Sequence, residues 1–290
     1  MLVATVVGAG LTLTIAGCLC IAVRAMINER RAFRPTCTVS KDSTPLAASR
    51  PVSFDSAGIN IHGEFVDTTN GRVVLLIHGT ESVLQDMYAR AEMLIERGYG
   101  VLLIDLPGHG QSGGRPTWDE QERNAVRRAI DFCQQQPSVG KRGVLALGFS
   151  SGAYILAQVA LTERRLVGVV LEGCYTSIGA LVNWQYRRYG WFSRYPAFWT
   201  DRYYGMKSRD IQPIDIVQRI APIATFLIAG TEDRVVPAVM GEELYAAARE
   251  PKVLWLVDGA GHGDYQRVAP TQYAQRIAAF LEAAWTQKGA

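Results

Sequence analysis

The sequence predicts an α/β fold in which a mostly parallel sheet is flanked by helices. From residue 51 onward, short continuous apolar runs alternate with stretches whose apolar residues recur every three or four positions. The short runs lack polar alternation, which is typical of strands buried on both faces of a parallel sheet. Strands that alternate with helices in this way indicate a sheet wrapped by helices. The fold class is therefore α/β.

Residues 1–23 are predicted to be a membrane anchor outside this fold. The segment has no charged side chain, and a helix of that length, about 35 Å, spans a hydrocarbon core of roughly 30 Å. Arginines follow it closely and favour the cytoplasmic side, so the catalytic domain is expected in the cytoplasm. Two alternatives stay open, and in both the protein is exported. In the first the chain is a lipoprotein, with Cys18 as the lipidated residue of Ile15-Ala16-Gly17-Cys18. In the second it carries a cleaved signal peptide.

Residues 24–50 are predicted to be a linker, and residues 51–290 form the folded domain. The end of the linker is rich in Ser, Thr and Pro and has little periodicity. The domain opens with SFDSAGINIHGEFV (53–66), where Ala57-Gly58 signals the turn of a hairpin.

Six apolar runs then predict the strands of the sheet, and the segments between them predict helices. The strands are VVLLI (73–77), GVLLIDL (100–106), GVLALGF (143–149), LVGVVLE (166–172), ATFLIAG (224–230) and VLWLV (253–257). The helices are 82–98, 119–136, 150–161, 240–249 and 269–285.

The alternation breaks at about 175–222, where aromatic side chains gather. They include Trp184, Trp191 and Trp199. We expect a short aromatic-rich insertion over the end of the sheet, where ligand-binding loops lie in this architecture. Trp and Tyr favour a membrane interface, although the same rings are equally compatible with packing as core. Four arginines among them are candidates for contact with lipid head groups: Arg187, Arg188, Arg194 and Arg202.

Composition limits the function classes. The 290 residues are 48% apolar and 20% charged, which excludes a disordered chain. The net charge of +3 comes without a basic stripe, so nucleic acid is not an expected partner. The five cysteines form no CxxC pair and the four histidines are scattered, so we expect no metal centre and no disulfide framework.

The segment GFSSG (148–152) predicts a nucleophilic serine at Ser150. It fits G-x-S-x-G between a predicted strand and a predicted helix, where a sharp turn exposes the serine oxygen. Small residues at Gly148 and Gly152 allow the strand and the helix to approach closely. Ser151 is a competitor, but it is off-centre in the motif, and its N–H at the start of a helix is its useful group.

A serine needs a base, and His262 is the expected one. It follows the last predicted strand in the Gly-rich loop 259–263. His62 belongs to the opening hairpin and is expected at the surface. His78 and His109 lie in Gly-containing turns and are expected to be structural.

The acid that fixes the histidine tautomer is expected at Asp233. The segment GTEDRVVP (230–237) follows the penultimate strand, which gives the chain order Ser, Asp, His. Glu232 and Asp264 remain alternatives, while Asp105 suits a turn role in DLPGHGQSGG.

Two N–H groups are expected to bind a developing oxyanion: those of Ser151 and Thr80. Thr80 lies in the loop after the first parallel strand, where Gly79 lets the backbone approach the site. An ordinary glycine turn is the alternative interpretation of that loop.

Together these segments resemble the α/β-hydrolase superfamily over roughly residues 51–285. The matching segments are LLIHGT (75–80), GYGVLLIDLPGHGQSGG (98–114), GFSSG (148–152), GTEDRVVP (230–237) and GAGHGD (259–264). Within the superfamily the chain is similar to the monoacylglycerol-lipase and serine-aminopeptidase-like group. CYTSI (174–178), followed by an aromatic insertion, is typical of its membrane-anchored branch with a short insertion, some members of which are protein depalmitoylases.

The resemblance implies a catalytic triad, two oxyanion donors and no cofactor. The triad is Ser150, Asp233 and His262, and the donors are Thr80 and Ser151. Phe149 stands before the serine where lipase-like relatives usually have histidine, which leaves the substrate size open.

The expected function is a serine hydrolase that cleaves carboxylic ester or thioester bonds through an acyl-enzyme intermediate. A lipid-like or small acyl substrate at a membrane is the expected partner. A serine peptidase and a non-catalytic hydrolase-like binding module are the alternatives.

Overall fold

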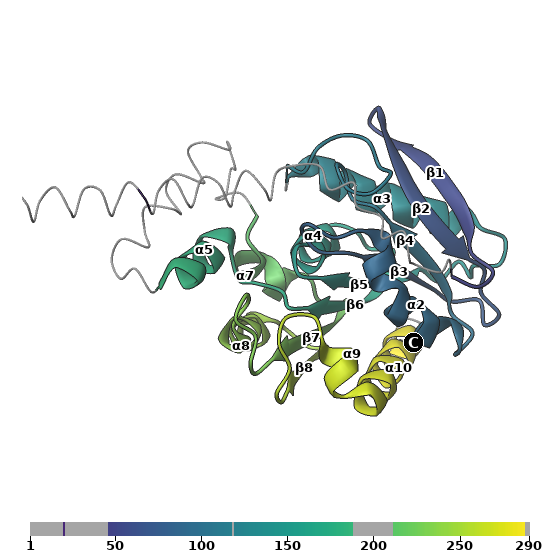
Figure 1. Cartoon of the computed structure of the whole chain (residues 1–290). Helices are drawn as coiled ribbons and strands as arrows, with labels where there is room; N and C mark the ends of the chain where they lie inside the picture. The colour runs from purple at the N-terminus through teal and green to yellow at the C-terminus, as the bar shows by residue number, and fades with distance from the viewer. Residues whose placement is uncertain (1–19, 21–45, 118, 188–210, 288–290) are drawn as a thin grey trace, which may run out of the picture.

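The computed structural model describes residues 20, 46–117, 119–187 and 211–287 (Figure 1). Except for Cys20, the predicted anchor lies outside these residues, as does the linker up to residue 45. None of the helices in the described part of the chain combines the length and the apolar character of a membrane span.

An eight-stranded sheet forms the centre of the molecule, in the order β1-β2-β4-β3-β5-β6-β7-β8. The first two strands are the predicted hairpin, and β2 also pairs antiparallel with β4. All other neighbouring strands are parallel. The strands are β1 (Arg50–Ser56), β2 (Ile59–Val66), β3 (Val73–Ile77), β4 (Gly100–Ile104), β5 (Val144–Phe149), β6 (Leu166–Glu172), β7 (Ala224–Gly230) and β8 (Lys252–Val257).

Helices cover both faces of the sheet, which confirms the predicted α/β fold. One face packs against α3 (Glu120–Gln135), α4 (Ser151–Ala160) and α8 (Ala238–Ala247). The other packs against α2 (Tyr88–Ile95) and α10 (Pro270–Gln287), which lie side by side in Figure 1. The remaining described helices are η1 (Leu84–Met87), α5 (Ile178–Tyr186), α7 (Pro213–Ile216), η3 (Val217–Arg219) and α9 (Tyr265–Val268).

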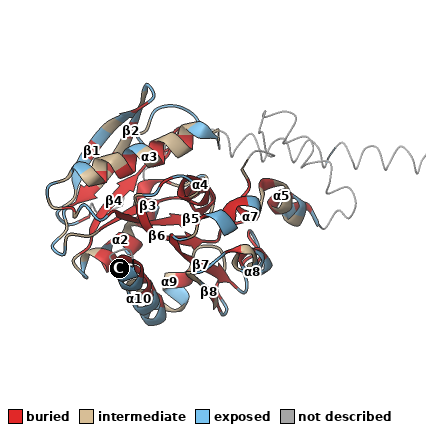
Figure 2. Ribbon diagram, turned by 180° about the vertical axis from the view of Figure 1, so that it is seen from behind, coloured by how far each residue is buried: buried red, intermediate tan, exposed pale blue. Residues whose placement is uncertain are grey.

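Strand β3 shows why its sequence is apolar throughout. Val73, Leu75 and Ile77 enter the core on one face, whereas Val74 and Leu76 enter the core on the other. Successive side chains of a strand point to opposite faces, so a strand covered on both sides needs an apolar residue at every position. Figure 2 shows the central strands buried along their length.

The predicted insertion begins with α5 and ends with α7 and η3. Residues 188–210, with Trp191, Trp199 and three of the four arginines named above, lie outside the described residues. Trp184 of α5 donates a hydrogen bond from its indole nitrogen to the carbonyl oxygen of Arg234, at 3.3 Å. The start of this segment therefore lies against the loop that follows β7.

Candidate active site

Ser150 occupies the sharp turn between β5 and α4. Its backbone has φ 53° and ψ −117°, a region that a residue with a side chain seldom adopts. The turn is closed by two glycines. A Cβ on Gly148 would lie 2.6 Å from the carbonyl oxygen of Gly152, and one on Gly152 would lie 2.4 Å from that of His78. The strand, the helix and the β3 loop thus approach more closely than side chains allow.

His262 lies in the loop after β8 and reaches Ser150. Its Nε2 is 3.0 Å from Ser150 Oγ, and its Nδ1 is 2.7 Å from Asp233 Oδ2. The imidazole is 19% exposed, while the Asp233 carboxylate is buried. The three predicted residues therefore form one hydrogen-bonded chain, although they come from three different strand ends.

Asp233 is fixed by the backbone of its own loop. Its Oδ1 accepts hydrogen bonds from the N–H groups of Val235 and Val236, both at 2.8 Å. This leaves Oδ2 to face the imidazole. The two alternative acids lie elsewhere: Glu232 is exposed, and Asp264 pairs with Arg267. The geometry places Asp233 opposite His262.

The two expected oxyanion donors flank Ser150. Ser151 is the first residue of α4, where an N–H group has no acceptor within the helix. The loop that carries Thr80 also lies against Ser150, because a Cβ on Gly79 would be 3.2 Å from the Cβ of Ser150. Both N–H groups thus belong to backbone that adjoins the serine.

The other histidines serve the fold. His78 and His109 are buried with their rings 5.0 Å apart, as expected for structural residues. The expectation for His62 was wrong, because its ring is only 14% exposed and its Nδ1 lies 3.3 Å from Asp105 Oδ2. Asp105 has the expected turn role, since its carboxylate also accepts the N–H groups of Leu84 and Gln111.

This hydrogen-bonded chain can transfer a proton. An imidazole bonded to a serine hydroxyl on one side and to a carboxylate on the other accepts the hydroxyl proton as the oxygen attacks. Burial of Asp233 within its loop fixes the ring orientation that this transfer needs.

Comparison with known proteins identifies the family of the chain. A profile of the alpha/beta hydrolase family matches residues 74–218. The uncharacterized protein Rv2307c of Mycobacterium tuberculosis is 30% identical over 239 residues, which is 78% of this chain and 76% of that protein. The chain belongs to the alpha/beta hydrolase family. The uncharacterized protein YfhR of Salmonella typhi is 26% identical over 238 residues, 76% of each chain.

Solved structures show the same hydrolase fold. The Pyrococcus furiosus esterase PF2001 superposes with a TM-score of 0.72 at 21% identity, covering 87% of this chain and 97% of that one. At this identity the likeness concerns the fold alone.

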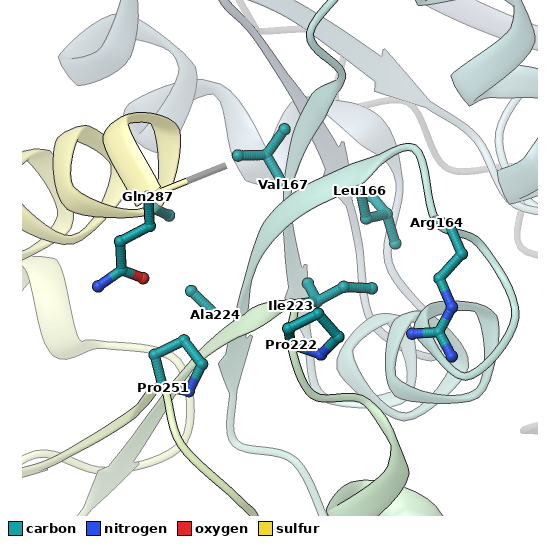
Figure 3. Close-up of a pocket in the computed structure, with 9 residues that line it drawn as sticks. Arg164, Leu166, Val167, Pro222, Ile223, Ala224, Pro251 and Gln287 are labelled. Atoms are coloured by element: carbon teal, nitrogen blue, oxygen red, sulfur yellow. The ribbon is translucent and has the colours of Figure 1, made fainter. Parts of the chain in front are cut away.

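A cavity of about 410 Å³ lies away from Ser150, Asp233 and His262 (Figure 3). It is lined by Leu166 and Ala224, which begin β6 and β7, and by Pro251 before β8. Ser150, Asp233 and His262 follow the opposite, carboxyl ends of β5, β7 and β8. This cavity is therefore not the space beside Ser150.

A buried ion pair next to the site of this hydrolase was not predicted from the sequence. Arg90 of α2 and Glu172 of β6 are 6% and 0% exposed, and their side chains are 2.8 Å apart. The signal was present, because Glu172 ends an otherwise apolar strand and Arg90 stands at helical spacing from Met87 and Leu94.

Proposed function

We propose that this hydrolase cleaves carboxylic ester or thioester bonds with Ser150 as nucleophile, through an acyl-enzyme intermediate. The hydrogen-bonded chain from Asp233 through His262 to Ser150 is the observation that carries the proposal. The strained backbone of Ser150 supports it as well, since such a turn exposes the oxygen.

Acylation begins when Ser150 Oγ attacks the carbonyl carbon and its proton passes to His262 Nε2. The N–H groups of Thr80 and Ser151 bind the oxyanion of the tetrahedral intermediate. As the intermediate collapses, the bond to the alcohol or thiol breaks, and Nε2 gives its proton to the leaving group. Asp233 remains ionised and stabilises the imidazolium.

Deacylation repeats these steps with water. A water molecule gives a proton to Nε2 as its oxygen attacks the acyl-enzyme. Collapse of the second intermediate returns the proton to Ser150 and releases the carboxylic acid. Apart from the substrate and water, these steps use Ser150, His262, Asp233 and the two N–H groups.

The proposed substrate is a lipid-like acyl ester or thioester at a membrane surface. The uncharged segment 1–23 and the aromatic residues of 175–222 support this part of the proposal. So does the resemblance to the monoacylglycerol-lipase-like group and its membrane-anchored branch. The domain then faces the cytoplasm, held by its N-terminal segment.

Labelling with a fluorophosphonate probe tests the nucleophile. Wild-type protein should be labelled at Ser150, and Ser150→Ala should lose labelling together with a factor of about 10⁴ or more in kcat. Ser151→Ala is the matched control and should keep both, because its expected role uses the backbone N–H. Labelling that persists in Ser150→Ala and disappears in Ser151→Ala would contradict the assignment.

A substrate panel then separates the candidate reactions. Nitrophenyl esters with acyl chains from C2 to C16 should be compared with an acyl-thioester and a peptide amide. Ester or thioester turnover that increases with chain length supports the proposal. Preferential amide cleavage would indicate a peptidase, and a folded protein that neither reacts nor is labelled would be a binding module.

A further inference from the structure

A charged cluster lies buried next to the loop that carries His262, the proposed base. The Arg90 guanidinium donates its Nε–H to Glu172 Oε2 at 2.8 Å, and the hydroxyl of Tyr273 donates to Glu172 Oε1. All three side chains are buried, and they come from α2, β6 and α10. Removing such charges from water costs more than their attraction returns unless the geometry is excellent. A contribution to stability therefore does not by itself explain why this ion pair is buried here.

The other contacts of Arg90 lead to the active site. Its Nη2 donates to the carbonyl oxygen of Gly263 at 3.3 Å, and its guanidinium carbon lies 5.4 Å from the centre of the Phe149 ring. Gly263 directly follows His262, and Phe149 directly precedes Ser150. One cation thus contacts the chain neighbours of both the base and the nucleophile.

These neighbours are packed against each other. The rings of Phe149 and His262 have centroids 4.8 Å apart. A Cβ on Gly263, whose φ is +86°, would lie 2.6 Å from the Cζ of Phe149. Arg90, Phe149 and His262 therefore form a continuous series of contacts, in which the Phe149 and His262 rings are tilted by 43°. Misplacement of a reacting group by about 1 Å can cost about 10²-fold in rate.

Charge balance keeps this arrangement compatible with a protonated base. His262 faces Asp233 and Ser150. Its ring and the buried Tyr265 hydroxyl both lie close to Gly173, where an added Cβ would be 3.1 Å from His262 Cε1 and 2.9 Å from the hydroxyl oxygen. Burial is the largest single influence on the pKa of Arg90 and lowers it, but Glu172, together with Tyr273 and Tyr265, raises this pKa overall. Burial also raises the pKa of Tyr265 and Tyr273 well above the ordinary range, so both hydroxyls stay neutral. Arg90 and Glu172 cancel each other, and no uncompensated cation opposes the imidazolium.

We propose that Arg90, held by Glu172, is a positioning residue that sets His262 relative to Ser150 through the Gly263 carbonyl and the Phe149 ring. This inference rests on the proposed function, because it assigns His262 the part of the base. Tyr273 holds Glu172, and Glu172 orients the guanidinium of Arg90. Because the guanidinium is a planar fork of donors, it bonds to Glu172 and to the Gly263 carbonyl at the same time.

Arg90→Met should lower kcat on a short nitrophenyl ester by about 10²-fold, with KM nearly unchanged. The kcat is expressed per active site titrated with the fluorophosphonate probe, so that a smaller folded fraction does not imitate the effect. The rate constant of labelling should fall with kcat, because acylation of Ser150 also needs the base. Arg90→Lys should recover part of the loss, since it restores the charge but not the fork.

The double variant Arg90→Met/Glu172→Gln distinguishes positioning from simple charge neutralisation. It leaves no uncompensated charge, so thermal unfolding should return toward that of the wild type. Under the proposal, kcat per titrated site stays as low as in Arg90→Met because the contact with Gly263 is still missing. Recovery of wild-type kcat in the double variant would overturn the proposal, since Arg90 would then act only as a counter-ion.

Arg165→Met is the matched control. Arg165 also pairs with carboxylates, those of Glu163 and Asp131, but it lies before β6 at the opposite edge of the sheet. Its loss should leave kcat per titrated site unchanged. A wild type that the probe fails to label at Ser150 would refute the proposed function itself. A labelled wild type with an equally fast Arg90→Met would refute only the positioning by Arg90.

Discussion

His78 connects the loop after β3 to the loop after β4. Its Nδ1 donates to the carbonyl oxygen of Gly79 at 2.7 Å, and its Nε2 accepts the N–H of Leu106 at 3.0 Å. The backbone partners assign the tautomer, because a carbonyl can only accept and an N–H can only donate. Burial, aided by the nearby His109 ring, lowers the pKa of His78 to about 4. A proton on Nε2 would break the bond to Leu106.

We therefore expect the protein to lose stability as the pH falls from 6.5 toward 4. In the unfolded chain His78 has its ordinary pKa of 6.5, whereas in the folded chain its pKa is about 4. Between these pH values the unfolded chain therefore binds a proton at His78 and the folded chain does not. The contribution of His78 to the free energy of unfolding, about 3 kcal/mol, is complete above pH 6.5 and is lost as the pH falls from 6.5 to 4. Denaturant unfolding at several pH values measures it. In His78→Gln, the decrease in the free energy of unfolding between pH 7 and pH 4 should be smaller by that amount. Equal decreases in the two proteins would refute this assignment.

Individual residues were predictable where a motif fixes their spacing. Ser150, Asp233 and His262 each follow a strand in a short, recognisable segment, and the structure brings them together. Arg90 and Glu172 have no such segment, since their meaning depends on a contact across 82 positions. A single charged residue on an otherwise apolar strand or helix does not reveal its role in the sequence, because its partner is known only from the structure.

The strand-to-helix turn from β5 to α4 is the element that presents Ser150, the proposed nucleophile. It depends on the close approach at Gly148, where an added Cβ would lie 2.6 Å from a carbonyl oxygen and 2.7 Å from the N of Ala153. Both neighbours are backbone atoms, which cannot rotate away. Gly179, in the first turn of α5, is the opposite case, because an added Cβ there would meet only Ser177 Oγ at 4.0 Å.

Gly148→Ala should destabilise the protein by about 1–3 kcal/mol, as overpacking does, and should slow labelling of Ser150 by a fluorophosphonate. Gly179→Ala is the control and should gain up to about 1 kcal/mol, because alanine favours a helix. Denaturant unfolding compares the two variants with the wild type. A Gly148→Ala protein as stable as Gly179→Ala would show that the turn has room for a side chain.

Element boundaries depended on contacts that the sequence does not show. The helix predicted over 82–98 begins as η1 and continues as α2 only to Ile95. Its first turn is tied down by side chains, since Asp86 accepts the N–H of Val83 and Asp105 accepts that of Leu84. The last predicted helix begins at Pro270, after the separate turn α9. The strands matched more closely, because burial on both faces fixes their length.

At the scale of the whole molecule, the sheet order places the site. Ser150, Asp233 and His262 follow β5, β7 and β8, which lie parallel at one side of the sheet. Parallel strands direct their carboxyl ends to one edge, so residues far apart in the chain meet there. This convergence follows from the alternation of strands and helices and was predictable. The position of the domain relative to a membrane depends on the N-terminal segment, and it stays a prediction.

Deleting residues 1–34 should separate catalysis from membrane attachment. The shortened protein should hydrolyse a short water-soluble ester at the rate of the full chain, because the described sheet and its active site begin after this segment. It should be slower on a long-chain ester embedded in phospholipid vesicles, where attachment raises the local enzyme concentration. Initial rates on both substrates, with Ser150→Ala as the background, measure the difference.

Full-length Cys18→Ala decides which kind of attachment operates. An apolar anchor does not depend on a thiol, so this variant should match the wild type on vesicles. A Cys18→Ala protein as slow as the deletion would instead indicate lipidation at Cys18. Equal rates of the full chain and the deletion on embedded substrate would refute the membrane-surface proposal. The assignment of Ser150, Asp233 and His262 would be unaffected, because the soluble ester measures it separately.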